Sequence, residues 1–285
     1  MSEGDDPRRR VDVVHGGDLV RLAATLDEAA PAAGTVPPLW HWTSFLERSA
    51  SATLGEDGHP RSGGLIADPP HPRRMFAGGR LTWLAPFPSD VGVMRVAEVG
   101  EIVHKEGSNG PLAFVTVTLR YLVDGTEVLT EEQDLVYLPE RDPAAPKPAP
   151  APVREPEDAV APLWSESVAF GQVQLFRFSA LTFNAHRIHY DLPYATGVEG
   201  YPGTVIHGPL LITRLLEPVR RRFGDEALST LSFRAKSPAF CGEGVSFVAF
   251  DDGMDDGGGR RLRLVARRGA LVLMEATAVL RHGLS

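Results

Sequence analysis

The chain has 285 residues and a formal net charge of −8, with 43% hydrophobic and 23% charged residues. These values are typical of a globular protein with one large domain or two smaller ones, and the acidic balance argues against nucleic-acid binding through bulk charge. The one cysteine, Cys241, excludes an internal disulfide and the cysteine-rich zinc and iron–sulfur centres.

The N-terminal segment, residues 1–16, is polar and is expected to be mobile. It has no apolar stretch of the signal-peptide type, and the sequence has no apolar run long enough to span a membrane. We therefore expect a cytoplasmic protein.

Two motifs of the first half carry aromatic and basic residues. The run PLWHW at 38–42 suits either a core or the lining of a ligand pocket. The motif HPRRMFAGGR at 71–80 contains Arg73, Arg74 and Arg80, which form either a solvated face or a site for an anionic ligand. No long amphipathic helix is predicted between Gly64 and Leu81.

Alternation predicts antiparallel strands in the rest of the first half. In the stretch 112–122, Val115, Val117 and Leu119 alternate with threonines, as in a half-buried strand. A turn at Asp124-Gly125 leads into a second strand-like stretch, 126–138. The first half is therefore expected to end in a long hairpin.

The stretch RDPAAPKPAPAPVREPEDAVAP, residues 141–162, is rich in proline and predicts a semi-rigid linker. It divides the chain into residues 17–140 and 163–285. Both parts show an aromatic residue, a proline five residues on and a glycine four further: Trp83, Pro88 and Gly92, then Phe233, Pro238 and Gly242. Each part then ends in a hairpin, and this order of elements indicates an internal duplication.

A helix is predicted to begin at Gly208, because Pro209 fits the first helical position, where a missing N–H costs nothing. Three leucines fall on one face of this helix: Leu211, Leu215 and Leu216. The arginines at 220–222 are favourable near a helix C-terminus. Pro218 is expected to kink or end the helix early, which gives a length of about 12–15 residues.

The stretch 177–195 carries the residues best suited to chemistry. Asn184, His186, His189 and Asp191 fall within eight residues there. A histidine can move a proton near neutral pH, and the first N–H groups of the following helix can polarise a carbonyl oxygen. Together they favour adding or removing water across a double bond next to a thioester carbonyl.

On these residues the chain resembles the MaoC-like hot dog hydratases and dehydratases. More closely, it is similar to the group of double hot dog enzymes that includes hydroxyacyl-thioester dehydratase type 2 and mesaconyl-C4-CoA (3-methylfumaryl-CoA) hydratases. The resemblance covers nearly the whole chain. Its carriers are PLWHWTSFLE, HPRRMFAGGRL, HKEGSNGPLAFVTV and LTEEQDLVYL in the first half, and FRFSALTFNAHRIHYD, HGPLL and FRAKSPAF in the second.

The resemblance implies an α+β double hot dog fold, in which two long antiparallel sheets wrap a central helix. Residues 17–140 would form a degenerate unit that helps to bind substrate. Residues 163–285 would form the catalytic unit, so that one active site serves two hot dog units.

The resemblance also implies the catalytic residues. Its motif, roughly S-G-D-x-N-P-x-H, places the histidine on His189 and the aspartate on Asn184, which cannot act as a general base but can hold water or substrate. The N–H of Gly208 would stabilise the oxyanion. A structural role for His189 and a turn role for Asn184 remain open alternatives.

Five further residues are expected to contact substrate: Arg73, Arg74, Arg234, His186 and His207. Arg234, with Lys236, is a candidate contact for CoA phosphates. The group His186, His189 and Asp191 could be read as metal ligands, but its spacing matches no zinc signature, so no metal is predicted.

The predicted function is a hydro-lyase acting on an enoyl-CoA thioester, with no cofactor beyond the CoA of the substrate. The resemblance favours a branched C4 dicarboxylate, mesaconyl-C4-CoA or itaconyl-CoA. Alternatives are a (3R)-hydroxyacyl-CoA or acyl-carrier-protein dehydratase for aliphatic chains, a hot dog thioesterase, and a non-catalytic acyl-thioester binding module. A homodimer of double hot dog units is a further expectation, without nucleic-acid or membrane partners.

Overall fold

The computed structural model describes residues 6–61, 65–66, 68–107, 110–140 and 161–283. Within these ranges, eleven strands form one antiparallel sheet in the order β1-β3-β5-β6-β2-β8-β11-β10-β9-β7, with β4 paired to β5. The strands are β1 (Arg9–Val13), β2 (Arg73–Trp83), β3 (Gly92–Val99), β4 (Val103–Gly107), β5 (Gly110–Val123), β6 (Thr126–Leu138), β7 (Trp164–Ala169), β8 (Leu228–Ala235), β9 (Gly244–Met254), β10 (Arg260–Arg268) and β11 (Leu271–Leu280).

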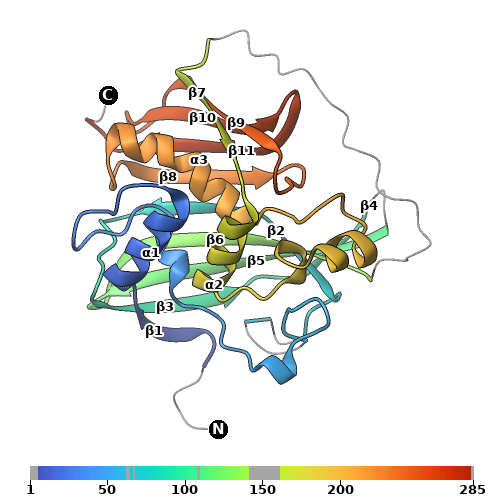
Figure 1. Ribbon diagram of the computed structural model, residues 1–285. Helices are drawn as coiled ribbons and strands as arrows, with labels where there is room; N and C mark the ends of the chain where they lie inside the picture. The colour runs from blue at the N-terminus through green and yellow to red at the C-terminus, as the bar shows by residue number, and fades with distance from the viewer. Residues whose placement is uncertain (1–5, 62–64, 67, 108–109, 141–160, 284–285) are drawn as a thin grey trace.

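The helices lie together on one face of the curved sheet (Figure 1). They are α1 (Gly16–Leu26), α2 (Gln172–Leu181) and α3 (Gly208–Phe223), with short helical turns η1 (Trp40–Thr43), η2 (Ser51–Thr53), η3 (Arg187–His189) and η4 (Tyr194–Val198). Helix α3 crosses the strands of the second half, whereas α2 lies beside α1 over the first half. The helices of the described ranges are too short or too polar to cross a membrane.

The strand order repeats about the centre of the sheet. The first half runs β1-β3-β5-β6-β2 toward the middle, and the second half runs β7-β9-β10-β11-β8 toward the same point from the other side. Each half is thus a sheet wrapped around helices, and the fold is the double hot dog that the sequence predicted. The two expected sheets are continuous, because β2 pairs antiparallel with β8 at the centre.

The seam between the halves depends on two glycines of the HPRRMFAGGR motif. Gly78 pairs with Arg234 and Gly79 with Phe233. A β-carbon on Gly78 would lie 2.4 Å from the carbonyl oxygen of Phe233, and one on Gly79 would lie 2.7 Å from that of Glu132. Because no side chain fits at either distance, glycine is required at both positions for β2 to join its neighbours.

The hairpins predicted at the end of each half are present. Asp124 and Gly125 turn between β5 and β6 with φ of 47° and 80°, and Gly269 turns between β10 and β11 with φ of 56°. In β5, Val115, Val117 and Leu119 are buried while the two threonines between them are partly exposed, which confirms the expected alternation.

The expectation that residues 1–16 are mobile is wrong for its second half. Residues Arg9–Val13 form β1, which pairs with β3 at the edge of the sheet. The backbone groups of an edge strand gain hydrogen bonds whatever the polarity of the side chains, so composition did not reveal this strand. The predicted linker, 141–162, falls almost entirely outside the described residues.

Helix α3 is longer than Pro218 led us to expect. It runs for 16 residues with Pro218 inside it. An internal proline costs about 3 kcal/mol, but the leucine face predicted for this helix is buried in the core, and burial of a leucine contributes about 1.5–3 kcal/mol. Leu211, Leu215 and Leu216 are at most 4% exposed, so their packing outweighs the missing hydrogen bond.

Candidate active site

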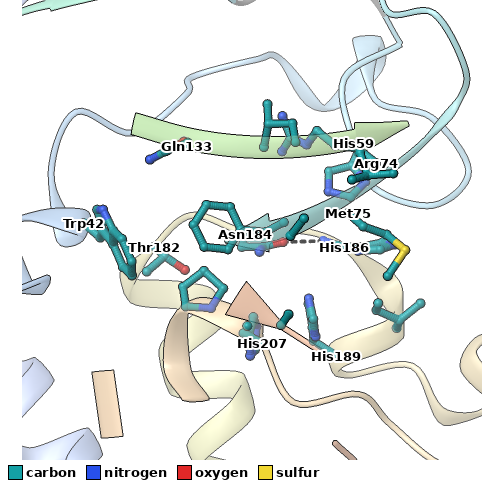
Figure 2. A pocket seen from close by; sticks show the side chains of 18 of the residues that line it. Trp42, His59, Arg74, Met75, Gln133, Thr182, Asn184, His186, His189 and His207 are labelled. Atoms are coloured by element: carbon teal, nitrogen blue, oxygen red, sulfur yellow. Dashed lines mark hydrogen bonds between the residues drawn. The ribbon is translucent and has the colours of Figure 1, made fainter. Parts of the chain in front are cut away.

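A cavity of about 630 Å³ lies between the two halves of the molecule (Figure 2). The first half lines it with residues of β2 and β6, such as Arg74, Phe76 and Gln133. The second half contributes the loop that follows α2 and the start of α3. This volume is within the usual range for small-molecule sites.

His189 projects into this cavity from the 3₁₀ turn η3 and is 7% exposed. Its Nδ1 donates a hydrogen bond to the carbonyl oxygen of Val205 at 2.7 Å. This bond fixes the tautomer and leaves Nε2 with a free lone pair. Burial lowers the pKa of His189 to about 4, against the opposing effect of the Val205 bond. The ring is therefore a neutral base across the neutral pH range.

His207 holds the His189 ring in place. The two imidazoles are stacked with centroids 3.6 Å apart and an interplanar angle of 20°. His207 is itself buried, and its Nε2 is 2.8 Å from Ser179 Oγ. Burial lowers the pKa of His207 well below its usual value, and the neighbouring histidines add to this effect. A neutral His207 places no competing charge beside His189.

Asn184 lies beside these rings at the cavity wall. The side-chain Oδ1 of Asn184 accepts a hydrogen bond from the backbone N–H of His186 at 2.9 Å. The backbone N–H of Asn184 donates to the carbonyl oxygen of Ser179 at 2.8 Å. The open alternative of a turn role is thus realised. Because Oδ1 is engaged in the turn, Nδ2 is the part of the amide suited to hold a water molecule or a substrate oxygen.

Gly208 begins α3 directly after His207 and lines the cavity. An N–H at the first position of a helix has no acceptor within the helix, and it carries the positive end of the helix dipole. Pro209 offers no N–H, as the sequence showed. The start of α3 therefore presents the Gly208 N–H as a donor near His189.

The arginines predicted to bind substrate differ in their surroundings. Arg73 Nη2 donates to Glu199 Oε2 at 3.0 Å, so its charge is balanced within the protein. Arg74 lines the cavity beside Tyr137: burial raises the pKa of Tyr137, and the charge and hydrogen bond of Arg74 oppose that rise. Figure 2 shows Arg74 at the same end of the cavity as His59 and His186. Arg73 and Arg74 both line the cavity, and Arg73 is the one that is paired with a carboxylate there.

The other basic candidates lie elsewhere. Arg80 points to the outer face of the sheet, where it pairs with Asp134 and Glu132. Arg234 is exposed on β8 and stands outside the cavity wall, so the structure does not support its predicted contact with substrate. Lys236 lies at the cavity wall but forms an ion pair with Glu275 at 2.8 Å.

The aromatic run PLWHW has both of the roles considered for it. Trp42 lines the cavity, whereas His41 is buried beneath it. Both donate to the fully buried carboxylate of Glu131, His41 Nε2 at 2.9 Å and Trp42 Nε1 at 2.8 Å. Gln133 also donates to Glu131, at 2.6 Å. Burial opposes the ionisation of Glu131, but these bonds and the His41 charge lower its pKa below the usual value.

A loop of the first half, residues 55–61, completes one end of the cavity and was missed from the sequence. Its backbone contacts the segment 184–191 of the second half, where the backbone N–H of Arg187 donates to the carbonyl oxygen of Asp57 at 2.8 Å. Gly58 has φ of 91°, and a β-carbon there would lie 1.9 Å from Ala185 O. The loop presents His59, whose ring centroid lies 4.1 Å from that of His186. In the sequence, the turn-forming DGHP stretch at 57–60 was the only indication of this loop.

The metal-ligand grouping considered from the sequence does not form. Asp191 pairs instead with Arg187 and accepts the N–H of Tyr194 at 3.0 Å. Ligand atoms of Asp57, His59 and His186 do lie within 4.8 Å of one another. Both oxygens of Asp57 already accept hydrogen bonds from His59, one from its backbone and one from its ring.

A double hot dog with a buried neutral histidine, an asparagine and a helix N-terminus at one cavity defines a MaoC-like hydratase or dehydratase. The comparisons agree with this class. The family model for hydroxyacyl-thioester dehydratase type 2 matches residues 39–241. The chain therefore belongs to the hydroxyacyl-thioester dehydratase type 2 family.

Two curated relatives are similar over most of their length. The mesaconyl-C(4)-CoA hydratase of Chloroflexus aurantiacus is 46% identical over 226 residues, 78% of each chain. The mitochondrial hydroxyacyl-thioester dehydratase type 2 of Schizosaccharomyces pombe is 27% identical over 249 residues, 77% of this chain and 79% of its own. Both names describe the addition or removal of water, and the chain is a hydro-lyase of enoyl thioesters, as predicted.

Solved structures support the fold. A MaoC-like dehydratase superposes with a TM-score of 0.71 at 14% identity and covers 97% of this chain and 98% of its own. HtdX from Mycobacterium tuberculosis gives a TM-score of 0.66 at 17% identity, with coverage of 95% and 99%. At these identities the likeness shows the double hot dog architecture alone.

Proposed function

We propose that the protein hydrates a branched C4-dicarboxylyl-CoA of the mesaconyl-C4-CoA type, with His189 as the base. The observation that carries this proposal is the buried, neutral His189, whose Nδ1 is held by Val205 and whose Nε2 is left for the cavity. The 46% identity to a mesaconyl-C(4)-CoA hydratase supports the choice of substrate.

In the proposed reaction, the thioester oxygen lies at the N–H of Gly208 and a water molecule lies between Asn184 and His189. His189 Nε2 takes a proton from the water, whose oxygen bonds to the β-carbon. The electron pair of the double bond moves through the α-carbon to the thioester oxygen, where the Gly208 N–H stabilises the negative charge. The α-carbon then takes the proton back from His189, so that one water molecule has been added.

The second carboxylate of such a substrate is attached at the β-carbon and therefore lies close to His189. Arg74 supplies a cation at that end of the cavity, and its fork of N–H donors suits a carboxylate. In this proposal Arg74 recognises the carboxylate, whereas the paired Arg73 fixes the neighbouring backbone through Glu199.

A thioester panel tests the function. Loss of the enoyl absorbance is followed with mesaconyl-C4-CoA, crotonyl-CoA and a longer unbranched enoyl-CoA, conversion of itaconyl-CoA, whose double bond is not conjugated with the thioester, is followed by chromatography, and a chromogenic reagent detects free thiol. We expect the highest kcat/KM on a branched dicarboxylate and no thiol release.

Two arginine variants locate the specificity. Arg74→Met should lower kcat/KM for the dicarboxylate by about 10- to 100-fold, since a charge-assisted bond is lost. Arg80→Met, a matched change on the outer face of the same strand, should have no effect. A wild-type preference for unbranched monocarboxylates would favour the aliphatic dehydratase instead, and thiol release would favour a thioesterase.

A further inference from the structure

The loop 55–61 brings a further histidine to the active-site cavity, from the half of the molecule opposite His186, His189 and His207. His59 lines the cavity, with its side chain 17% exposed. It comes from the half that contributes neither His189 nor the start of α3. Its position depends on the close approach of Gly58 to Ala185, which only glycine permits.

Asp57 orients the His59 ring. Asp57 Oδ1 accepts the backbone N–H of His59 at 2.9 Å, and Oδ2 accepts Nδ1–H at 3.0 Å. With Nδ1 committed to Asp57, Nε2 is the ring nitrogen available to a ligand in the cavity. A proton on Nε2 makes the ring an imidazolium whose charge Asp57 balances, and that N–H can donate to an anion.

The surroundings of His59 favour an anion over a metal ion. Burial lowers the pKa of His186, and the neighbouring histidines lower it further. The charges of Arg74 and Arg73 add to this effect, which shows that both arginines lie near His186. Both oxygens of Asp57 are used by His59, so the carboxylate has no oxygen left without a donor. A divalent cation at Asp57, His59 and His186 would have to share these oxygens with the hydrogen bonds from His59 and would approach two arginines.

We propose that His59, held by Asp57, is a specificity residue that binds the second carboxylate of the substrate together with Arg74. This inference rests on the proposed function, because it assigns the carboxylate site for that dicarboxylate. The site is composite: the catalytic histidine comes from the second half, and the carboxylate is bound by side chains of the first.

The test compares two substrates in the full-length enzyme. His59→Phe keeps a ring beside His186 but removes both nitrogens, and Asp57→Asn weakens the hold on Nδ1. We expect His59→Phe to raise KM and lower kcat/KM for mesaconyl-C4-CoA by about 10- to 100-fold, with less than about a threefold change for crotonyl-CoA. Asp57→Asn should show a smaller loss with the same selectivity.

His104→Gln, a change at an exposed residue of β4, is the matched control and should leave both rates unchanged. An equal loss on both substrates would show a structural role for His59 and overturn the proposal, as would an unchanged preference for the dicarboxylate. Stoichiometric zinc in the purified enzyme that His59→Phe abolishes would overturn it in favour of a metal site. A wild-type enzyme without a dicarboxylate preference would instead refute the proposed function.

Discussion

Acidification of the enzyme tests the state of His189, because the burial of this residue makes activity and stability fall at different pH values. Burial lowers the pKa of His189 to about 4, compared with about 6.5 for a free histidine. As the base, His189 must be neutral to act. We therefore expect kcat/KM on crotonyl-CoA, which lacks the carboxylate assigned to His59, to be level from pH 8 to about pH 5, where about 10% of the base is protonated, and to halve near pH 4.

The stability of the fold should begin to fall at a higher pH. The folded pKa of His189 is below the unfolded one, so the unfolded chain binds more protons between pH 6.5 and pH 4. The contribution of His189 to the free energy of unfolding is then fully present above pH 6.5 and is lost as the pH falls toward 4. The difference corresponds to roughly 3 kcal/mol for His189 alone. His186 and His207, whose pKa values are also lowered by burial, change stability in the same direction.

Two assays measure these effects. Initial rates at low substrate concentration, taken from the enoyl absorbance, give the pH profile of kcat/KM, and urea denaturation at each pH gives the free energy of unfolding. His189→Gln is the control for stability, because glutamine does not titrate in this range. An acidic limb of kcat/KM centred near pH 6.5 would refute the assignment of a desolvated base. Equal pH dependence of unfolding in the wild type and His189→Gln would refute it as well.

Two other variants test the support around the site. Asn184→Ala should lower kcat/KM by about 100-fold, because the attacking water loses its hydrogen-bond partner. A loss below about threefold would show that Asn184 only forms the turn with His186. Gln133→Ala, at the opposite wall of the cavity, is the comparison variant. Glu131→Gln should cost about 3 kcal/mol in urea denaturation, since the buried charge facing His41 and Trp42 is removed and an N–H₂ group meets their donors. A cost below about 1 kcal/mol would show that this network contributes little.

The sequence predicted the elements whose pattern is local. The strands of the hairpins were evident from alternation and from Asp124-Gly125, and α3 was evident from its leucine face. Pro218 was misread, because the propensity rule for proline is local whereas the burial that overrides it is tertiary. Strand β1 was missed because its pairing with β3 depends on backbone groups that composition does not describe.

For the site, the family motif located the residues that are close in sequence. Asn184, His189 and Gly208 lie within 25 residues of one another, and the structure brings them to one cavity. The roles of the arginines were not predictable, because Arg73, Arg74 and Arg80 are near neighbours that face different partners. His59 is 130 residues from His189, and only the docking of two halves reveals that both line the same cavity.

The duplication explains how one site uses both halves. The halves pair through β2 and β8, and the glycines at this seam allow β2 to approach its neighbours closely. The cavity therefore has one wall from each unit. The second half contributes the start of α3 and His189, while the first half contributes aromatic and cationic side chains such as Trp42 and Arg74.

The most direct measurement is the rate of enoyl absorbance loss on mesaconyl-C4-CoA by the wild type and by His189→Gln, at saturating substrate. Glutamine is a polar side chain of similar size, so the fold should be retained, and circular dichroism and thermal unfolding verify this. We expect kcat to fall by about 1,000-fold, since general-base catalysis is lost. Near-normal turnover by a folded His189→Gln enzyme would contradict the assignment of His189 as the base.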